Sequence, residues 1–258
     1  MYSLSVLFFF FASLSFGAHE RPHWLETQQA FAPASMLQNF LATLGPAPQD
    51  VTLTGNVSLS EGSTQETGSI RMLALGSNYS REELSFVDDS RVIVFSQGAA
   101  ISKQNAKATK LNSAIALMAQ SSLFPSSILA GMLNNPDVSV QYSGLESLGS
   151  AQAHHFILTD TFRSSPDLQD FSKLTQRDLW VDSSSLLPVQ LSYALSTGAG
   201  SGDIAVPVTV TYSDFAVSAG VTYAQHIGVS LNGTPWLSVS VTSISINSGL
   251  SPSEFQLN

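Results

Sequence analysis

The sequence contains no cysteine, so disulfides, cysteine nucleophiles, thiolate metal sites and cysteine-linked lipid anchors are all excluded. Stability must therefore come from packing alone. Charged residues are also scarce, at 11% of the 258 residues, against about a quarter in typical soluble domains. The surface must be covered largely by Ser, Thr, Asn and Gln, a composition typical of exported β proteins.

Basic residues are few and do not cluster. Lys and Arg together number 10 against 19 Asp and Glu, which gives a net charge of −9. Nucleic acids and anionic membrane surfaces attract positive patches, so neither class of partner is expected. Hydrophobic residues make up 43% of the chain, which is enough for a large core. A β-rich chain of this length commonly forms one domain.

Residues 4–16 form an apolar stretch that is too short for a comfortable membrane-spanning helix. Ser15, Gly17 and Ala18 supply the small residues of a cleavage site, so the sequence predicts a secretory signal peptide over residues 1–18. Because no Lys or Arg precedes the stretch, an uncleaved membrane anchor is the alternative. We expect residues 19–258 to form a single domain, periplasmic or secreted, and monomeric.

Two segments have the apolar spacing of helices. The first covers residues 24–44. The second is a helical insert at about 109–133, interrupted at Pro125. Its Met118 and Met132 are flexible apolar side chains of the kind that adapt to ligands of variable shape. The insert is therefore either a lid over the sheet or a plug that belongs to its core.

From residue 50 onward the hydrophobic period changes to two, as in strands with one buried face. Arg91 to Phe95 is almost continuously apolar, which indicates burial on both faces. Asn232-Gly233 predicts a hairpin turn, and the phase slip between Val241 and Ile244 predicts a bulge that bends the sheet. The expected strands are 51–59, 68–76, 80–87, 91–103, 137–142, 144–160, 189–195, 206–212, 221–231 and 237–246.

Residues that could support catalysis are sparse. No Gly-x-Ser-x-Gly elbow occurs, and residues 198–202 lack the lysine of a phosphate loop. His154 and His155 are adjacent on a predicted strand and must face opposite sides, which disfavours a shared metal ion. One buried, hydrogen-bonded ring and one exposed ring are expected. The acidic pair Glu82-Glu83 is interpreted as solvated edge charge.

The C-terminal part of the chain resembles a known family. Residues 178–182 (DLWVD) and 187–189 (LPV) resemble the hairpin of LolA/LolB-like lipoprotein carriers, in which an acidic turn precedes a Leu-Pro-hydrophobic motif. The other segments that resemble the family's terminal strands are 210–215, 219–221, 231–233 and 246–257. The resemblance covers about 175–258, and the order of helix, strands, helical insert and strands is compatible with it.

The resemblance implies the fold class: α+β, mainly β, with a strongly curved antiparallel sheet forming a half-open β-barrel. It includes an N-terminal helix, and it places the insert at 109–133 over the barrel mouth. Family members shelter acyl chains of lipoproteins or related lipids inside the barrel. The family's strand arginine has only a loose counterpart in Arg71, to which we assign no role.

These observations predict a non-enzymatic exported protein that binds an apolar ligand, namely an acyl chain, a lipid or the lipid moiety of an envelope lipoprotein. No catalytic residue, metal or cofactor is expected. The first alternative is a structural or surface-interaction protein of the envelope with a filled barrel. A hydrolase that uses His154 or His155 with a nearby Ser and Asp is the second. The residues predicted to line the cavity and lid are Ile115, Met118, Ile128, Met132, Val208, Val210, Tyr212 and Tyr223.

Overall fold

The computed structural model describes residues 32–111, 125–196 and 204–256, with only the backbone described at 125–128. These residues are mainly β and form one 13-stranded sheet. Its strands are β1 (Asp50–Glu61), β2 (Thr64–Leu75), β3 (Tyr79–Ser85), β4 (Ser90–Ser96), β5 (Ala99–Gln104), β6 (Lys107–Lys110), β7 (Val138–Leu148), β8 (Ala151–Asp160), β9 (Arg177–Asp182), β10 (Pro188–Ser196), β11 (Ala205–Ser218), β12 (Val221–Leu231) and β13 (Thr234–Ile246).

Short helices accompany the sheet. Pro33 occupies the first turn of the N-terminal helix, where a backbone N–H would have no partner within the helix, so its absence costs no hydrogen bond. Gly45, with a φ of 82°, ends the turn that follows, and a Cβ there would lie 2.0 Å from the Gly220 carbonyl oxygen, so only glycine fits. The helices described are α1 (Pro33–Leu41), η1 (Ala42–Leu44), α3 (Pro125–Leu133), η2 (Pro166–Leu174) and η3 (Pro252–Phe255).

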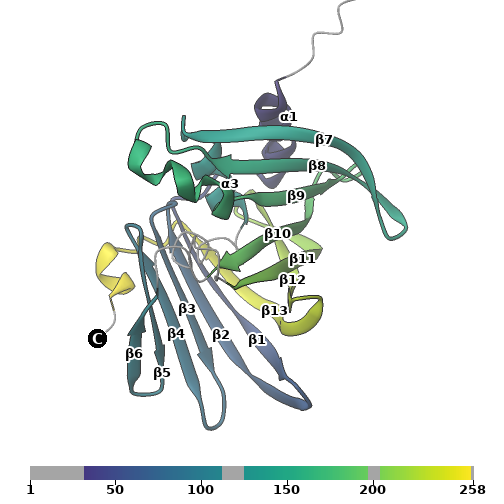
Figure 1. Ribbon diagram of the computed structural model, residues 1–258. Helices are drawn as coiled ribbons and strands as arrows, with labels where there is room; N and C mark the ends of the chain where they lie inside the picture. The colour runs from purple at the N-terminus through teal and green to yellow at the C-terminus, as the bar shows by residue number, and fades with distance from the viewer. Residues whose placement is uncertain (1–31, 112–124, 197–203, 257–258) are drawn as a thin grey trace, which may run out of the picture. The chain divides into compact units, whose positions relative to one another are not determined.

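The sheet consists of two antiparallel meanders joined by one long-range pairing. Its strand order is β6-β5-β4-β3-β2-β1-β13-β12-β11-β10-β9-β8-β7. Every pair of neighbouring strands is therefore also adjacent in the chain, except β1 and β13. β6 and β7 form the two edges, and α3 lies on the connection between them. Figure 1 shows β1 to β6 on one side of this arrangement and β7 to β9 on the other.

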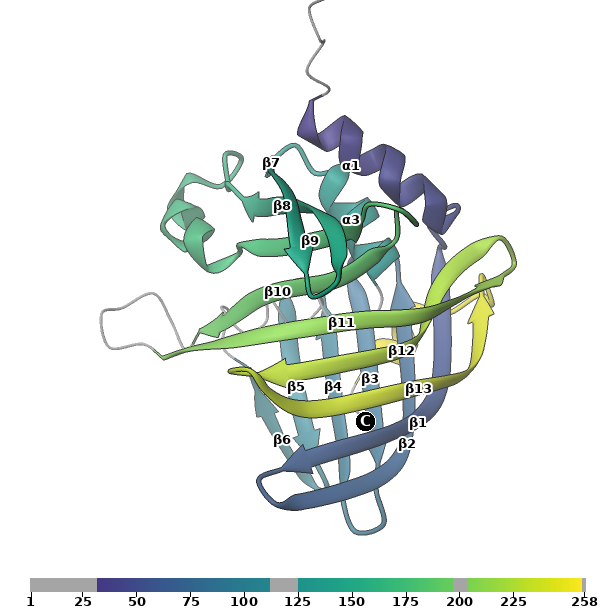
Figure 2. The ribbon, with the colours of Figure 1, turned by 90° about the vertical axis from the view of Figure 1, so that its right-hand side faces the viewer.

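Strand direction rotates across the sheet. In Figure 2, β3 to β5 run steeply, whereas β10 to β13 run across the view. Strands twist naturally, and bulges increase the twist locally. The predicted bulge is confirmed: the β1–β13 register shifts between Thr54 and Gly55, and Thr242 is the extra residue that the pairing skips. A Cβ at Gly55 would lie 2.4 Å from the Ser240 carbonyl oxygen, so the bulge also needs glycine.

The alternation in the sequence correctly predicts the buried side chains in the middle of β11. Val208 and Val210 of β11 are buried, and Thr211 between Val210 and Tyr212 is exposed. Asn232 and Gly233 both have positive φ and form the β12–β13 turn, as predicted. Val94 and Phe95 are buried on opposite faces of β4, which confirms that this strand is covered on both sides.

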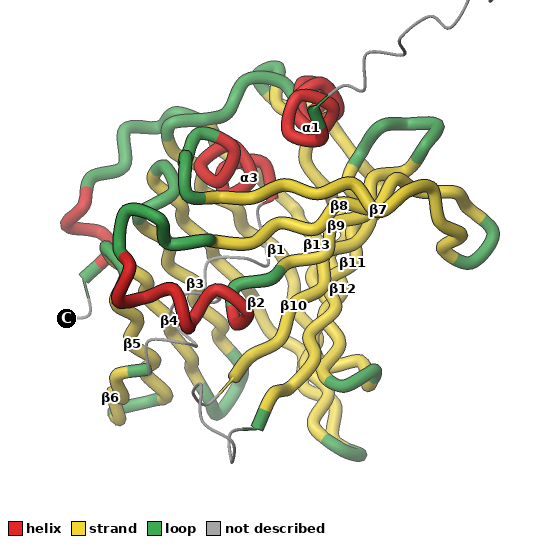
Figure 3. Tube along the Cα trace, turned by 45° about the horizontal axis from the view of Figure 1, so that its top comes forward, coloured by secondary structure: helices red, strands yellow, loops and turns green. Residues whose placement is uncertain are grey.

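The main core covers one face of the sheet, which we call the inner face. It joins buried side chains of β1–β3 and β8–β13 to α1 and α3 through Leu37, Leu129 and Met132. Figure 3 shows α1 and α3 near the same end of the sheet. The opposite, outer face is largely polar. Its exception is a small apolar cluster in which Phe255 of η3 packs on Leu73 of β2 and Val94 of β4.

Several predicted boundaries need correction. The helix expected over 24–44 is described only as α1 and η1, because residues 1–31, including the predicted signal peptide, lie outside the described residues. The insert expected at 109–133 starts too early, since Lys107–Lys110 forms β6 as an edge strand, and edge strands are often protected by lysine. The run 91–103 is two strands separated by a turn at Gln97-Gly98.

Candidate functional site

Five of the eight predicted site residues have described side chains, and they belong to the main core or pack on it. Val208, Val210 and Tyr212 of β11 are exposed by only 2%, 0% and 3%. Burial raises the pKa of the Tyr212 phenol well above its ordinary value. Met132 of α3 joins the same core, and Tyr223 of β12 is half-buried against it. The structure brings these five residues into one apolar cluster.

The other three predicted site residues cannot be placed in the same way. Ile115 and Met118 lie outside the described residues, and Ile128 lies in α3 within the stretch whose side chains are not described. Contact with a ligand therefore stays a prediction for all eight. Of the five described residues, Tyr223 retains the most accessible surface, so it is the one a ligand reaches with least displacement of the core.

A second part of the inner face is less completely covered. Glu82 of β3 is paired with Met72 of β2 on one side and with Ile93 of β4 on the other. Directly opposed residues of antiparallel strands share a face, so the three side chains form a row. All three keep accessible surface, in contrast to the buried residues of β11. We call Met72, Glu82 and Ile93 the open patch.

Glu82 is the unexpected member of the open patch. It lies two residues before Leu84, which belongs to the main core, so both side chains are on the inner face. Burial raises the pKa of the Glu82 carboxyl to about 7. The interpretation of Glu82-Glu83 as solvated edge charge is therefore wrong for Glu82. Glu83 points to the outer face, where its carboxylate pairs with Arg71 at 3.3 Å and Arg81 at 2.7 Å.

Arg177 of β9 is a second charged residue on the inner face. It shares that face with Leu179 and Val181, and its side chain is only 5% exposed. Its guanidinium lies 3.5 Å from an Asp160 carboxylate oxygen and donates to the Thr175 carbonyl oxygen at 3.0 Å. Burial lowers the pKa of Arg177, and Asp160 opposes this shift. The alternation with Leu179 and Val181 was the signal that could have identified it.

Arg71, the loose counterpart suggested by the family resemblance, lies elsewhere. It is on the outer face of β2, opposite Glu83, and its side chain is 46% exposed. An arginine in that position is a surface ion-pair partner, which contributes little to stability. The described structure therefore gives Arg71 no part in the inner face.

His154 and His155 face opposite sides of β8, as predicted. His155 is buried, with its Nδ1 2.8 Å from Glu146 Oε1 and its Nε2 2.9 Å from Asp178 Oδ1. Its ring stacks on Trp180, with the ring centroids 4.4 Å apart. The Trp180 indole N–H donates to Glu146 at 3.0 Å, and this bond together with His155 lowers the pKa of Glu146. Both imidazole nitrogens are thus occupied by carboxylates.

His154 lies on the inner side and is half-buried rather than exposed, which corrects that part of the prediction. The Tyr142 hydroxyl is 2.9 Å from its Nδ1, and the Phe40 ring of α1 lies against it. Burial lowers the pKa of His154. Among the described residues, no serine hydroxyl is hydrogen-bonded to either imidazole. The described residues therefore contain no Ser–His pair of the kind that the hydrolase alternative requires.

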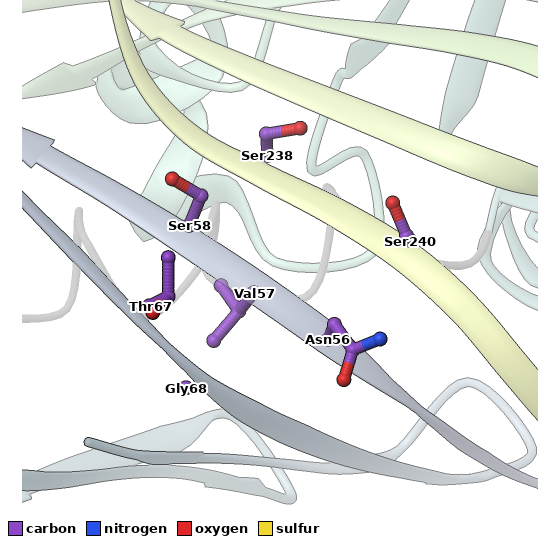
Figure 4. A pocket seen from close by; sticks show the side chains of 7 residues that line it. All are labelled: Asn56, Val57, Ser58, Thr67, Gly68, Ser238 and Ser240. Atoms are coloured by element: carbon purple, nitrogen blue, oxygen red, sulfur yellow. The ribbon is translucent and has the colours of Figure 1, made fainter. Parts of the chain in front are cut away.

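The outer face carries a shallow groove of about 370 Å³ along β1, β2 and β13. Figure 4 shows Ser58 beside Ser238, with Asn56 and Ser240 further along the same two strands. Thr67 and Gly68 of β2 and Val57 of β1 complete its lining. Small hydroxyl side chains leave this part of the sheet uncovered, but nothing in the groove provides charge or apolar depth for a specific ligand.

A smaller pocket of about 210 Å³ lies at the rim of the inner face, between the N-terminal helical segment and α3. Leu41 and Leu44 line it from one side, and Ala130 and Leu133 line it from the other. Both helices also contribute to the main core. The rim pocket is therefore a gap in the packing between the two helices.

Within the described ranges, no group of three or more His, Asp or Glu side chains is arranged to hold a metal ion. The same residues include no helix with the length and apolar character needed to cross a membrane. No protein-family model matches the sequence, and no curated protein matches it significantly.

Solved structures nevertheless share the fold. A LolA superfamily protein from Nitrosomonas europaea superposes with a TM-score of 0.57 at 14% identity, over 88% of this chain and 99% of that one. A Vibrio parahaemolyticus domain named for outer membrane lipoprotein sorting gives 0.55 at 12% identity, over 86% and 95%. A DUF1329 family protein from Desulfovibrio piger gives 0.54 at 14% identity, over 87% and 96%. The likeness spans nearly the whole of each chain and shows a common fold.

Proposed function

We propose that this protein is a non-enzymatic exported binder of an apolar ligand, either an acyl chain, a lipid or the lipid moiety of a lipoprotein. The observation that supports this most directly is the fold shared with the LolA superfamily and lipoprotein-sorting structures. The signal-peptide pattern at residues 1–18 supports export to the periplasm or beyond the cell. The net charge of −9 speaks against nucleic acid or an anionic membrane as the partner.

The proposed site lies under the inner face of a half-open barrel. In this proposal the sheet curves around the main core, and α1 and α3 cover it. Met132, Val208, Val210 and Tyr212 form the closed wall, and the open patch with Tyr223 receives the ligand. An acyl chain of about fifteen methylene groups gains roughly 12 kcal/mol of gross burial energy, of which binding costs remove a large part.

This proposal predicts saturable binding of a fluorescent acyl ligand by the mature protein. Filling the open patch should weaken that binding, so we expect Met72→Trp to raise the Kd at least tenfold. A bulky indole next to Glu82 occupies the space a chain would enter. Fluorescence titration of the delipidated protein measures this.

The matched control is Arg71→Trp, which adds the same side chain one position away but on the outer face. It should leave the Kd unchanged. Binding no greater than that of a denatured sample would refute the proposed function. If both variants lose the same affinity for the ligand, the binding site does not lie at the open patch.

One observation favours a second candidate, a structural or surface-interaction protein with a filled barrel. The inner faces of β8, β9, β11 and β13 contain side chains with no accessible surface, including Phe156, Leu179, Val210 and Val239. Such packing leaves no room for a ligand among those strands. Native mass spectrometry of protein purified from its own envelope distinguishes the two: a co-purifying lipid supports the binder, and a bare chain supports the filled barrel.

A further inference from the structure

Glu82 occupies a position where a charged side chain is normally excluded. It lies in the middle of β3, between Met72 and Ile93, and on the same face as the core residue Leu84. Its side chain is surrounded by protein yet retains accessible surface. A side chain with both properties borders space that other protein atoms do not fill.

No described neighbour neutralises this carboxyl. Arg81 and Glu83 on β3 and Arg71 on β2 point to the outer face, where they pair with one another. Lys103 of β5 stands opposite Val92, which packs in the outer cluster, and so also lies on that face.

Arg91 of β4 shares the inner face with Glu82 but is engaged elsewhere. It lies opposite Leu84, toward the β3–β4 turn. Its guanidinium is 2.7 Å from Asp89 and 2.7 Å from Glu61. Burial is accordingly the cause of the raised pKa of Glu82, and no hydrogen bond to its carboxyl is found among the described residues.

The protonation state of this group decides which ligands it accepts. A protonated carboxyl donates one hydrogen bond and accepts others, whereas an ionised carboxylate only accepts. A buried carboxyl beside apolar side chains favours the neutral form, because desolvation penalises charge. An ester carbonyl is a matching acceptor without charge. A fatty-acid carboxylate brought to the same place would create two acids competing for one proton, which is unfavourable.

We propose that Glu82 is the polar contact of the ligand site, and that the ligand is an uncharged acyl ester whose carbonyl oxygen accepts a hydrogen bond from the Glu82 carboxyl. This inference rests on the proposed function and deepens it, since it separates esterified acyl chains from free fatty acids. Met72 and Ile93 contact the adjoining methylene groups. Ionisation of Glu82 above neutral pH removes the donor and weakens binding of the ester.

The test compares a fluorescent monoacylglycerol with the fatty acid of the same chain length and fluorophore. For the native sequence, the Kd for the ester should rise about tenfold between pH 6 and pH 8.5. At pH 8.5 the fatty acid should bind at least tenfold more weakly than the ester. Glu82→Gln keeps size and a hydrogen-bond donor without a charge. It should make ester binding independent of pH and strengthen fatty-acid binding at pH 8.5 about tenfold.

Glu83→Gln is the matched control, because it changes the neighbouring acid on the outer face and should reproduce the native pH profile. If Glu82→Gln also reproduces that profile while both lipids bind, Glu82 is not the polar contact, although the proposed function stands. If the native chain and both variants bind neither lipid, the proposed function fails and this inference with it. A circular dichroism melt verifies that each variant is folded.

Discussion

Replacing Asp50 with alanine is expected to lower the free energy of unfolding by about 3 kcal/mol, which corresponds to a fall in Tm of roughly 6 to 12 °C for a chain of this size. Asp50 is the first residue of β1 and is 5% exposed. Its carboxylate accepts hydrogen bonds from the backbone N–H groups of Ser248, Gly249 and Leu250 at 2.7, 2.9 and 3.3 Å. The Ser248 hydroxyl adds a fourth at 2.9 Å.

These bonds hold the segment after β13 against the start of β1. The segment continues into η3, whose Phe255 is buried on the outer face of β2 and β4. Arg81 of β3 also donates to the carbonyl oxygens of Glu254 and Gln256 at 3.2 and 2.8 Å. Without the Asp50 carboxylate, three backbone donors lose their partner and η3 loses its attachment. The outer face of β3, the strand that carries Glu82, would then be less well covered.

The effect of Asp50 should depend on pH in a defined direction. Burial opposes ionisation of Asp50, but the hydrogen bonds from Gly249, Ser248 and Leu250 outweigh it and lower the pKa. A pKa that is lower in the folded state than in the unfolded state stabilises the fold at pH values above the unfolded pKa of about 3.9. This stabilisation is lost as the pH falls through the folded pKa.

Urea unfolding of native and Asp50→Ala proteins at pH 7, and then in steps down to pH 3, measures this contribution. The difference in free energy of unfolding between the two proteins should become smaller toward pH 3. Asp88→Ala, in the exposed β3–β4 turn, is the control and should change stability by less than about 0.5 kcal/mol. A loss below 1 kcal/mol at pH 7 in Asp50→Ala would mean that the carboxylate does not anchor the C-terminal segment.

Where a strand alternates cleanly, the sequence is sufficient to predict its buried face. Val208, Val210 and Tyr212 follow this rule, and the phase slip between Val241 and Ile244 correctly located the bulge at Thr242. These features are local, because the period of two and the turn residues are properties of a few neighbouring side chains. The family resemblance then placed the strands in a fold that the solved structures share.

β3 could not be interpreted in this way. Its sequence, YSREELS, is mostly polar, so no apolar alternation distinguishes an inner face from an outer one. The pairing of Glu82 with Met72 and Ile93, together with the core position of Leu84, determines which acid of the Glu82-Glu83 pair is turned inward. That pairing depends on the register of two hairpins and on the position of η3, which are tertiary properties.

The stability of ligand-free protein should reveal the cost of placing an acid at Glu82. Its pKa is raised from 4.5 to about 7 in the folded state. A raised acid pKa destabilises the fold progressively as pH rises from the unfolded value through the folded one, and the loss is complete above it. The shift corresponds to roughly 3 kcal/mol at pH 8 and to almost nothing at pH 4.5.

Glu82→Gln removes this titration while preserving the shape of the side chain. The free energy of unfolding of the variant minus that of the native protein should therefore increase by roughly 3 kcal/mol between pH 4.5 and pH 8, whatever the fixed contribution of the buried amide. Urea unfolding across that range measures the difference, and Glu83→Gln should not show the increase. A flat difference for Glu82→Gln would mean that water or a partner already satisfies the carboxylate. The open patch would then lack the unpartnered acid with a raised pKa on which selection of an uncharged ester depends.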